Sequence, residues 1–142
     1  PVFVIATAND VSQLPPEMLR KGRWDELFFV DLPHQNEREA IWDIQIRKHG
    51  RDPRVYDVQL LAKMTEGLTG SEIESVFVEA LYAGFEHEQE PTDLTIAQVL
   101  VDFVPLSKLM AEQIEGLRKW AKGRARLATS PLVEPKLRRL AA

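Results

Sequence analysis

The chain has 142 residues, of which 44% are apolar and 28% charged, and its formal net charge is −4. These values are ordinary for a soluble globular protein, and the absence of cysteine excludes a disulfide framework, a thiolate nucleophile and a cysteine-based zinc site. No apolar run approaches the roughly 18 residues that a membrane-spanning helix needs, so we expect a cytoplasmic protein that has no membrane partner.

The charge is unevenly distributed along the chain. Residues 118–142 carry eight basic side chains and one acidic one, whereas the remaining 117 residues carry 10 basic and 21 acidic side chains. Nucleic acid is an unfavourable partner for such an acidic body, because a phosphate backbone requires Lys and Arg on the contacting face. We predict that residues 124–142 form a basic, disordered tail. The alternative is that the basic residues of 118–142 contact phosphate, as in a nucleic acid, or an acidic partner.

Two short apolar runs at the start of the chain predict strands buried in a parallel sheet, at residues 2–6 and 27–30. Between them, residues 15–20 begin with two prolines and predict a short helix that ends at Gly22. Two strands of this length cannot form a stable sheet alone. Because the chain also begins at Pro1, directly inside an apolar run, we interpret it as a piece of a longer protein.

The middle of the chain has a helical pattern. Asn36 and Glu39 predict a capping box at the start of the first helix, with His34 as the alternative start. Asp57 predicts the N-cap of the next helix, which ends before Gly67. Each cap precedes apolar residues at helical spacing, which indicates helices that pack on one another.

The helical pattern continues to about residue 121. Thr69 and Glu72 form a second capping box, and the clearest i, i+3, i+4 apolar series of the chain follows it. A further helix is predicted to open at Thr95 and to be broken by Pro105, and Ser107 is predicted to cap the last helix. The sequence therefore predicts a mostly α fold, in which a helical bundle follows a two-strand remnant of a parallel α/β sheet.

Polar and basic residues near the first strand are candidates for chemistry. Asn9 follows that strand, at the edge where α/β sheets bind ligands, and its amide can orient a water or a phosphate oxygen; an ordinary turn is the alternative. Arg20 and Arg23 lie three residues apart, so their guanidiniums could together stabilise charge on a transferring phosphoryl group. The alternative is a structural role at the helix end, with Asp25 and Glu26 as partners.

Together these residues resemble the second region of homology of AAA ATPases. Asn9 matches the Asn of its Thr-Asn pair, although Ala8 stands where a threonine is common. Residues 20–25 match its Arg-Pro-Gly-Arg-Phe-Asp pattern, from which Lys21 and Trp24 depart. Downstream, residues 38–44 resemble the first helix of the AAA lid, and residues 67–73 resemble the lid signature Gly-x-Ser-Gly-Ala-Asp-Leu. The resemblance covers residues 1 to about 103, and the ending is similar to an uncharacterised AAA subgroup of cyanobacteria and plastids.

The resemblance implies catalytic roles for three residues. Asn9 would be the sensor 1 asparagine that positions the attacking water, and Arg20 and Arg23 would be arginine fingers that reach the nucleotide of a neighbouring subunit. It therefore implies a homo-oligomeric ring, expected to be a hexamer, that hydrolyses ATP with Mg²⁺ and moves a protein or another macromolecule.

The resemblance also implies nucleotide contacts in the lid. Gln45 falls on the lid-helix position that approaches the adenine, and Gly70 and Ser71 open a helix whose backbone N–H groups would face the nucleotide. The sequence holds no G-x-x-x-x-G-K-[ST] loop and no acidic Mg²⁺-binding strand, so we expect no metal ligands here and no ATP hydrolysis by this piece alone.

Three regions follow from these predictions. Residues 1–33 would be the remnant of the nucleotide-binding subdomain, residues 34–123 the helical lid with a C-terminal helical extension, and residues 124–142 the tail. The alternative function is a non-catalytic helical adaptor that uses its basic tail to contact an acidic partner.

Overall fold

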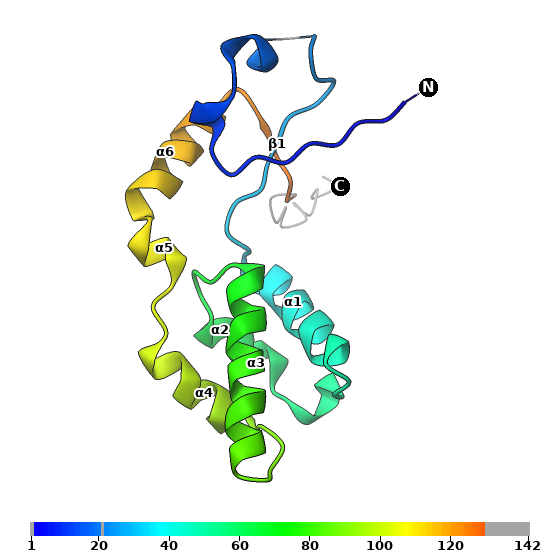
Figure 1. Cartoon of the computed structure of the whole chain (residues 1–142), viewed down its shortest axis with the longest axis vertical. Helices are drawn as coiled ribbons and strands as arrows, with labels where there is room; N and C mark the ends of the chain where they lie inside the picture. Colours follow the sequence, from blue (N-terminus) through cyan, green and yellow to red (C-terminus); the bar gives the residue numbers. More distant parts are fainter. Residues whose placement is uncertain (1, 21, 130–142) are drawn as a thin grey trace, which may run out of the picture. The chain divides into compact units, whose positions relative to one another are not determined.

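The computed structural model describes residues 2–20 and 22–129, and its elements are drawn in chain order in Figure 1. By their internal contacts these residues form two compact units. One unit contains residues 2–31 and 115–129, and the other is Leu32–Ile114. The sequence analysis grouped residues 115–123 with the helices that precede them, in a region over residues 34–123. By their contacts, residues 115–123 belong instead to the first unit.

The Leu32–Ile114 unit is a bundle of helices. Its elements are α1 (Gln35–Lys48), the 3-10 turn η3 (Pro53–Val55), α2 (Val58–Met64), α3 (Gly70–Glu86), α4 (Asp93–Asp102), α5 (Leu106–Leu109) and the first residues of α6 (Ala111–Ala121). Helix α3 packs against α1 and α4, and α2 packs against the same two helices. The mostly α fold class predicted from the sequence is confirmed.

The core of this unit is centred on two buried aromatic rings. Trp42 of α1 and Phe77 of α3 are fully buried, and their rings meet edge to face with centroids 6.0 Å apart. The indole N–H of Trp42 donates to Thr65 Oγ1 at 3.1 Å, and Thr65 donates in turn to the Leu61 carbonyl at 2.7 Å. The one indole donor that this core buries is therefore satisfied, which fixes the end of α2 against α1.

The helix starts agree only in part with the sequence predictions. Asn36 does not cap α1: the helix begins two residues earlier, with His34 as N-cap and Glu37 as its capping-box partner. The cap at Asp57 is confirmed. The capping box of Thr69 with Glu72 at the start of α3 is confirmed as well.

The last helical segment differs more from the prediction. Helix α4 begins at Asp93, with Thr92 as the N-cap and Thr95 as its capping-box partner. Ser107 caps no helix; α5 begins at Leu106, directly after Pro105, and its first N–H donates to a glutamate of α3. The predicted single helix is interrupted at residue 110, between α5 and α6.

The other unit contains little regular structure. It has two 3-10 turns, η1 (Val11–Gln13) and η2 (Pro16–Leu19), the end of α6, and two short strands, β1 (Phe28–Phe29) and β2 (Arg126–Leu127). The short helix expected at residues 15–20 is thus present as η2, and the strand expected at 27–30 as β1. The two strands pair in parallel.

The predicted strand at residues 2–6 is not formed. These residues pair with no strand of the described chain, and Phe3 is 88% exposed. A strand needs a neighbour for its backbone N–H and C=O groups, and the described residues offer none at this position. The two-strand sheet instead uses β2, from the start of the predicted tail; residues 130–142 of that tail lie outside the described residues.

No single helix in the described part of the chain has both the length and the apolar composition to cross a membrane. One bent pair, from α4 to α6, passes that test by length and composition alone.

Candidate functional site

Asn9 lies at a bend of the chain. Residues 2–8 before it have no regular secondary structure, and Asp10 after it caps η1 by accepting the backbone N–H of Ser12 at 2.8 Å. The Asn9 side chain is exposed, and no hydrogen bond holds it among the described residues. Its carbonyl oxygen and its amide N–H groups are therefore available to an outside group.

Arg20 and Arg23 occupy the turn that follows η2. The backbone N–H of Arg23 donates to the Arg20 carbonyl at 3.3 Å, and Gly22 between them has a φ of 88°, which favours glycine. Both side chains are exposed, and no carboxylate among the described residues pairs with either guanidinium. The structural alternative, pairing with Asp25 or Glu26, is not seen in this part of the chain; Lys21 lies outside the described residues.

Gly70 and Ser71 form the first turn of α3. Their backbone N–H groups have no acceptor among the described residues, as is usual for the first positions of a helix. The Ser71 hydroxyl lies 3.2 Å from that of Thr69. A Cβ built on Gly70 would lie 3.7 Å from Ile41 Cδ1, an ordinary contact, so packing within this unit does not require glycine at this position.

Gln45 lies on α1, four residues after Ile41, in the same unit as the start of α3. The residue is half-buried, and its Oε1 atom is fully buried without a hydrogen-bond donor among the described residues. A buried amide oxygen without a donor is costly, because it has lost water and gained no partner. This atom is therefore an acceptor without a donor within its own unit.

A carboxylate links the start of α3 to α5. Glu72 accepts the backbone N–H of Thr69 at 2.7 Å through Oε2 and the backbone N–H of Leu106 at 2.6 Å through Oε1. The capping box was predicted from its spacing. The contact with Leu106, 34 residues away, has no local sequence signal and was missed.

Arg38 is a second residue whose role the sequence did not reveal. It is 7% exposed, and its guanidinium donates to the carbonyl oxygens of Ala62 at 2.8 Å and Pro33 at 2.7 Å. It therefore joins the chain entering α1 to α2. The residue belongs to the segment that resembles the first lid helix, but a buried arginine bound to carbonyls could not be inferred from that resemblance.

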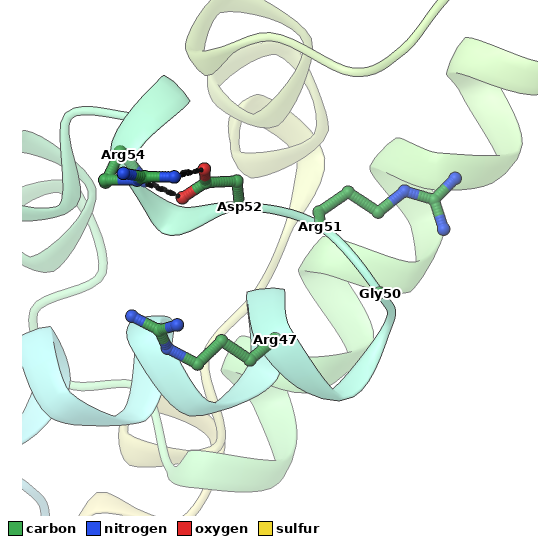
Figure 2. A pocket seen from close by; sticks show the side chains of 5 residues that line it. All are labelled: Arg47, Gly50, Arg51, Asp52 and Arg54. Atoms are coloured by element: carbon green, nitrogen blue, oxygen red, sulfur yellow. Dashed lines mark hydrogen bonds and ion pairs between the residues drawn. The ribbon is translucent and has the colours of Figure 1, made fainter.

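An open surface hollow of about 520 Å³ lies near the end of α1 and is lined by Arg47, Gly50, Arg51, Asp52 and Arg54. Figure 2 shows Arg54 lying against Asp52, while Arg51 points away from Arg47 and Arg54. The Arg54 Nη2 atom lies 2.6 Å from Asp52 Oδ2, and this hydrogen bond lowers the Asp52 pKa from 3.8 to about 2.

The arginines of this hollow are neutralised by their own chain. Arg47 pairs with Asp43 at 2.8 Å and Arg51 with Glu90 at 3.0 Å, so each cation that lines the hollow has a carboxylate partner. The predicted nucleotide contact Gln45 does not line this hollow, whose lining residues start at Arg47 near the end of α1. Because its cations are paired in this way, the hollow gives no reason to treat it as an anion site.

The basic C-terminal segment also pairs with its own chain. Arg118 binds both oxygens of Asp31, and Arg126 lies 3.2 Å from Glu26 Oε1. These contacts occupy two of the eight basic side chains of residues 118–142, one of which, Arg126, belongs to the tail of the adaptor hypothesis. Among the described residues no group of three or more His, Asp or Glu side chains is arranged to hold a metal ion.

The predicted site residues thus fall into two sets. Asn9, Arg20 and Arg23 belong to the unit that contains residues 2–31. The predicted nucleotide contacts Gln45, Gly70 and Ser71 belong to the Leu32–Ile114 unit. Residues of both sets carry polar groups without partners among the described residues, at exposed side chains in the first set and at backbone N–H groups and one buried oxygen in the second.

Comparison with known proteins identifies the relatives of this chain. The "uncharacterized AAA domain-containing protein ycf46" of Pyropia yezoensis is 44% identical over 131 residues, which are 91% of this chain and 27% of that protein. The protein of the same name from Trieres chinensis is 42% identical over 132 residues, again 27% of its length. The proteasome-activating nucleotidase of Sulfurisphaera tokodaii is 32% identical over 120 residues, 84% of this chain and 30% of that protein.

No family model matches the chain. The chain spans about a quarter to a third of the length of these relatives, and the similarity to two differently named groups of AAA proteins extends over most of it. The chain belongs to the AAA ATPase family, as a C-terminal region of the kind found in the plastid ycf46 proteins.

Proposed function

We propose that this chain supplies the trans-acting and lid parts of a ring-forming AAA ATPase. Asn9 positions the attacking water, and Arg20 and Arg23 stabilise the charge that develops on the transferring phosphoryl group in the neighbouring subunit. The full-length protein, expected to form a hexamer, binds ATP with Mg²⁺ and couples hydrolysis to moving a protein or another macromolecule. The ligands for Mg²⁺ lie outside this chain.

The observation that carries the proposal is the state of the two arginines. Both are exposed, they share a turn fixed by a backbone hydrogen bond, and neither is paired with a carboxylate among the described residues. A structural arginine at a helix end would be expected to bind a neighbouring carboxylate, and two acidic residues lie within three positions of Arg23. Guanidiniums that are left free in this way suit a partner supplied by another subunit.

The lid residues support a nucleotide substrate. Gly70 and Ser71 offer backbone N–H groups at a helix N-terminus, where a phosphate is favoured by the helix dipole. Gln45 offers a buried oxygen without a donor, which an exocyclic amino group such as that of adenine could satisfy. The residues present therefore fit an adenine nucleotide, and bound ATP would supply the phosphoryl group that is transferred to water.

The test uses the full-length protein with Arg20→Ala, Arg23→Ala and Asn9→Ala, and with Arg54→Ala as the control for the loss of an exposed arginine. Arg20→Ala should leave ATP binding largely intact and lower turnover by about 10³-fold, the scale found for such arginines. Mixing the Arg20→Ala and Asn9→Ala proteins should restore part of the activity, because some subunit boundaries then combine an intact arginine with an intact asparagine. Unchanged turnover of Arg20→Ala in an assembled ring would refute the assignment.

A further inference from the structure

The C-terminal segment pairs with the strand that follows the turn of Arg20 and Arg23. The backbone N–H of Arg126 donates to the Leu27 carbonyl, and that of Ala128 donates to the Phe29 carbonyl, both at 2.9 Å. The resulting ladder is parallel, with Phe28 opposite Arg126. Partners almost 100 residues apart in the sequence are thereby joined in one unit.

Two ion pairs join the C-terminal segment to carboxylates that precede and follow β1 in the sequence. Arg118 donates from Nε to Asp31 Oδ2 at 2.9 Å and from Nη2 to Asp31 Oδ1 at 2.8 Å, and Arg126 Nη1 lies 3.2 Å from Glu26 Oε1. The two-bonded arrangement fixes the carboxylate plane as well as its distance, so it specifies orientation. The hydrogen bond from Arg118 to Asp31 also raises the Arg118 pKa.

The first residue held by these ion pairs and ladder bonds is Glu26, three positions after Arg23. On its other side the turn is held by η2, where the Arg20 N–H donates to the Glu17 carbonyl at 3.4 Å and the Arg23 N–H to the Arg20 carbonyl. Gly22 lies between these supports. Its φ is positive, a conformation that glycine adopts without strain because it has no side chain. Fixing the second end of a short loop removes most of its remaining freedom.

We propose that residues 118–128 are a strap that positions the Arg20–Arg23 turn, and that Arg118 and Asp31 are positioning residues for phosphoryl transfer. The effect on turnover depends on the function proposed above, but the strap itself does not. A guanidinium that must meet a phosphoryl group across a subunit boundary loses rate when it is misplaced by about 1 Å, so rigidity of its turn matters for kcat.

The strap is compatible with a larger sheet in the full-length protein. Backbone groups of successive strand residues face alternate edges, and β2 takes the edge of Leu27 and Phe29. Among the described residues no strand occupies the opposite edge of β1. Pairing with β2 therefore leaves room for one further strand.

The test is a charge-exchange cycle with Arg118→Asp, Asp31→Arg and the double variant that exchanges both. Lys119→Asp is the control, since Lys119 is the next residue on α6, is largely exposed and lies 3.9 Å from Glu115. In the 142-residue chain, hydrogen exchange of the Arg126 and Ala128 amides should be about fivefold faster or more in each single variant, close to wild type in the double variant, and unchanged in the control.

In the full-length ATPase each single variant should lower kcat by about fivefold or more while KM for ATP changes less than twofold, and the double variant should recover kcat. Unchanged amide exchange in the single variants would overturn the strap, whatever the activity. Faster exchange with kcat equal to that of the control would overturn the positioning role. Failure of the arginine assignment itself would appear separately, as unchanged turnover of Arg20→Ala.

Discussion

Replacing Glu72 tests whether one carboxylate joins α3 to α5 in the Leu32–Ile114 unit. Its two oxygens accept different backbone donors, Thr69 N–H at 2.7 Å and Leu106 N–H at 2.6 Å, and Oε2 also lies 2.8 Å from the Thr69 hydroxyl. Glutamine has the same shape but only one acceptor oxygen, so Glu72→Gln must leave one of the two N–H groups facing an NH₂ group. Alanine removes both acceptors.

The expected losses follow from this difference in acceptors. A capping interaction contributes about 1 kcal/mol, and the bond to Leu106, although made to a charged acceptor, is partly exposed and contributes about 1 kcal/mol more. Glu72→Gln should therefore lower the free energy of unfolding by about 1 kcal/mol and Glu72→Ala by about 2 kcal/mol. Glu79→Gln is the matched control, because Glu79 is exposed on the same helix and should stay within about 0.5 kcal/mol of wild type.

The assay is urea unfolding of the 142-residue chain, followed by the helical circular dichroism signal and extrapolated linearly to zero denaturant. The m value should not change, because single substitutions scarcely alter the surface area that becomes exposed on unfolding. If Glu72→Gln proved as stable as Glu79→Gln, the carboxylate would hold only one of its two donors, and the reasoning would fail.

Three substitutions elsewhere extend the test. Gly84→Ala should destabilise the chain by about 2 kcal/mol or more in the same assay, since its Cβ would lie 2.5 Å from the Gln89 carbonyl oxygen. Gly70→Ala should be neutral or slightly stabilising. Equal losses of stability in the two variants would contradict the packing described. The Asp52 carboxyl should titrate near pH 2 by NMR, and Arg54→Ala should return its pKa toward 3.8. Because the folded pKa is lowered, the pair stabilises fully above about pH 3.8 and is lost as the pH falls toward 2.

Features encoded by neighbouring residues could be predicted from the sequence. The capping box of Thr69 and Glu72, the cap at Asp57 and the mostly helical fold all depend on spacings of three or four residues, and the structure confirms them. The start of α1 shows where such reasoning becomes ambiguous. Asn36 with Glu39 and His34 with Glu37 both have the capping-box spacing, and the helix begins at the second pair.

Features that join distant segments could not be predicted. The strand over residues 2–6 was inferred from composition, which describes a strand buried in a sheet, but the described chain contains no neighbour to pair with it. Arg118 and Asp31 are 87 residues apart, and neither has a local pattern that reveals the other. The roles of Asn9, Arg20 and Arg23 remain predictions, because they concern a partner subunit.

The segment after Pro105 makes contacts beside both sets of predicted functional residues. Leu106 donates to Glu72, which lies next to Gly70 and Ser71 at the start of α3. Farther along, Arg118 and Arg126 bind the segment that follows the turn of the two arginines. Each contact is made within one unit. The segment after Pro105 is therefore joined by hydrogen bonds to both units, next to residues that the sequence analysis predicted to be functional.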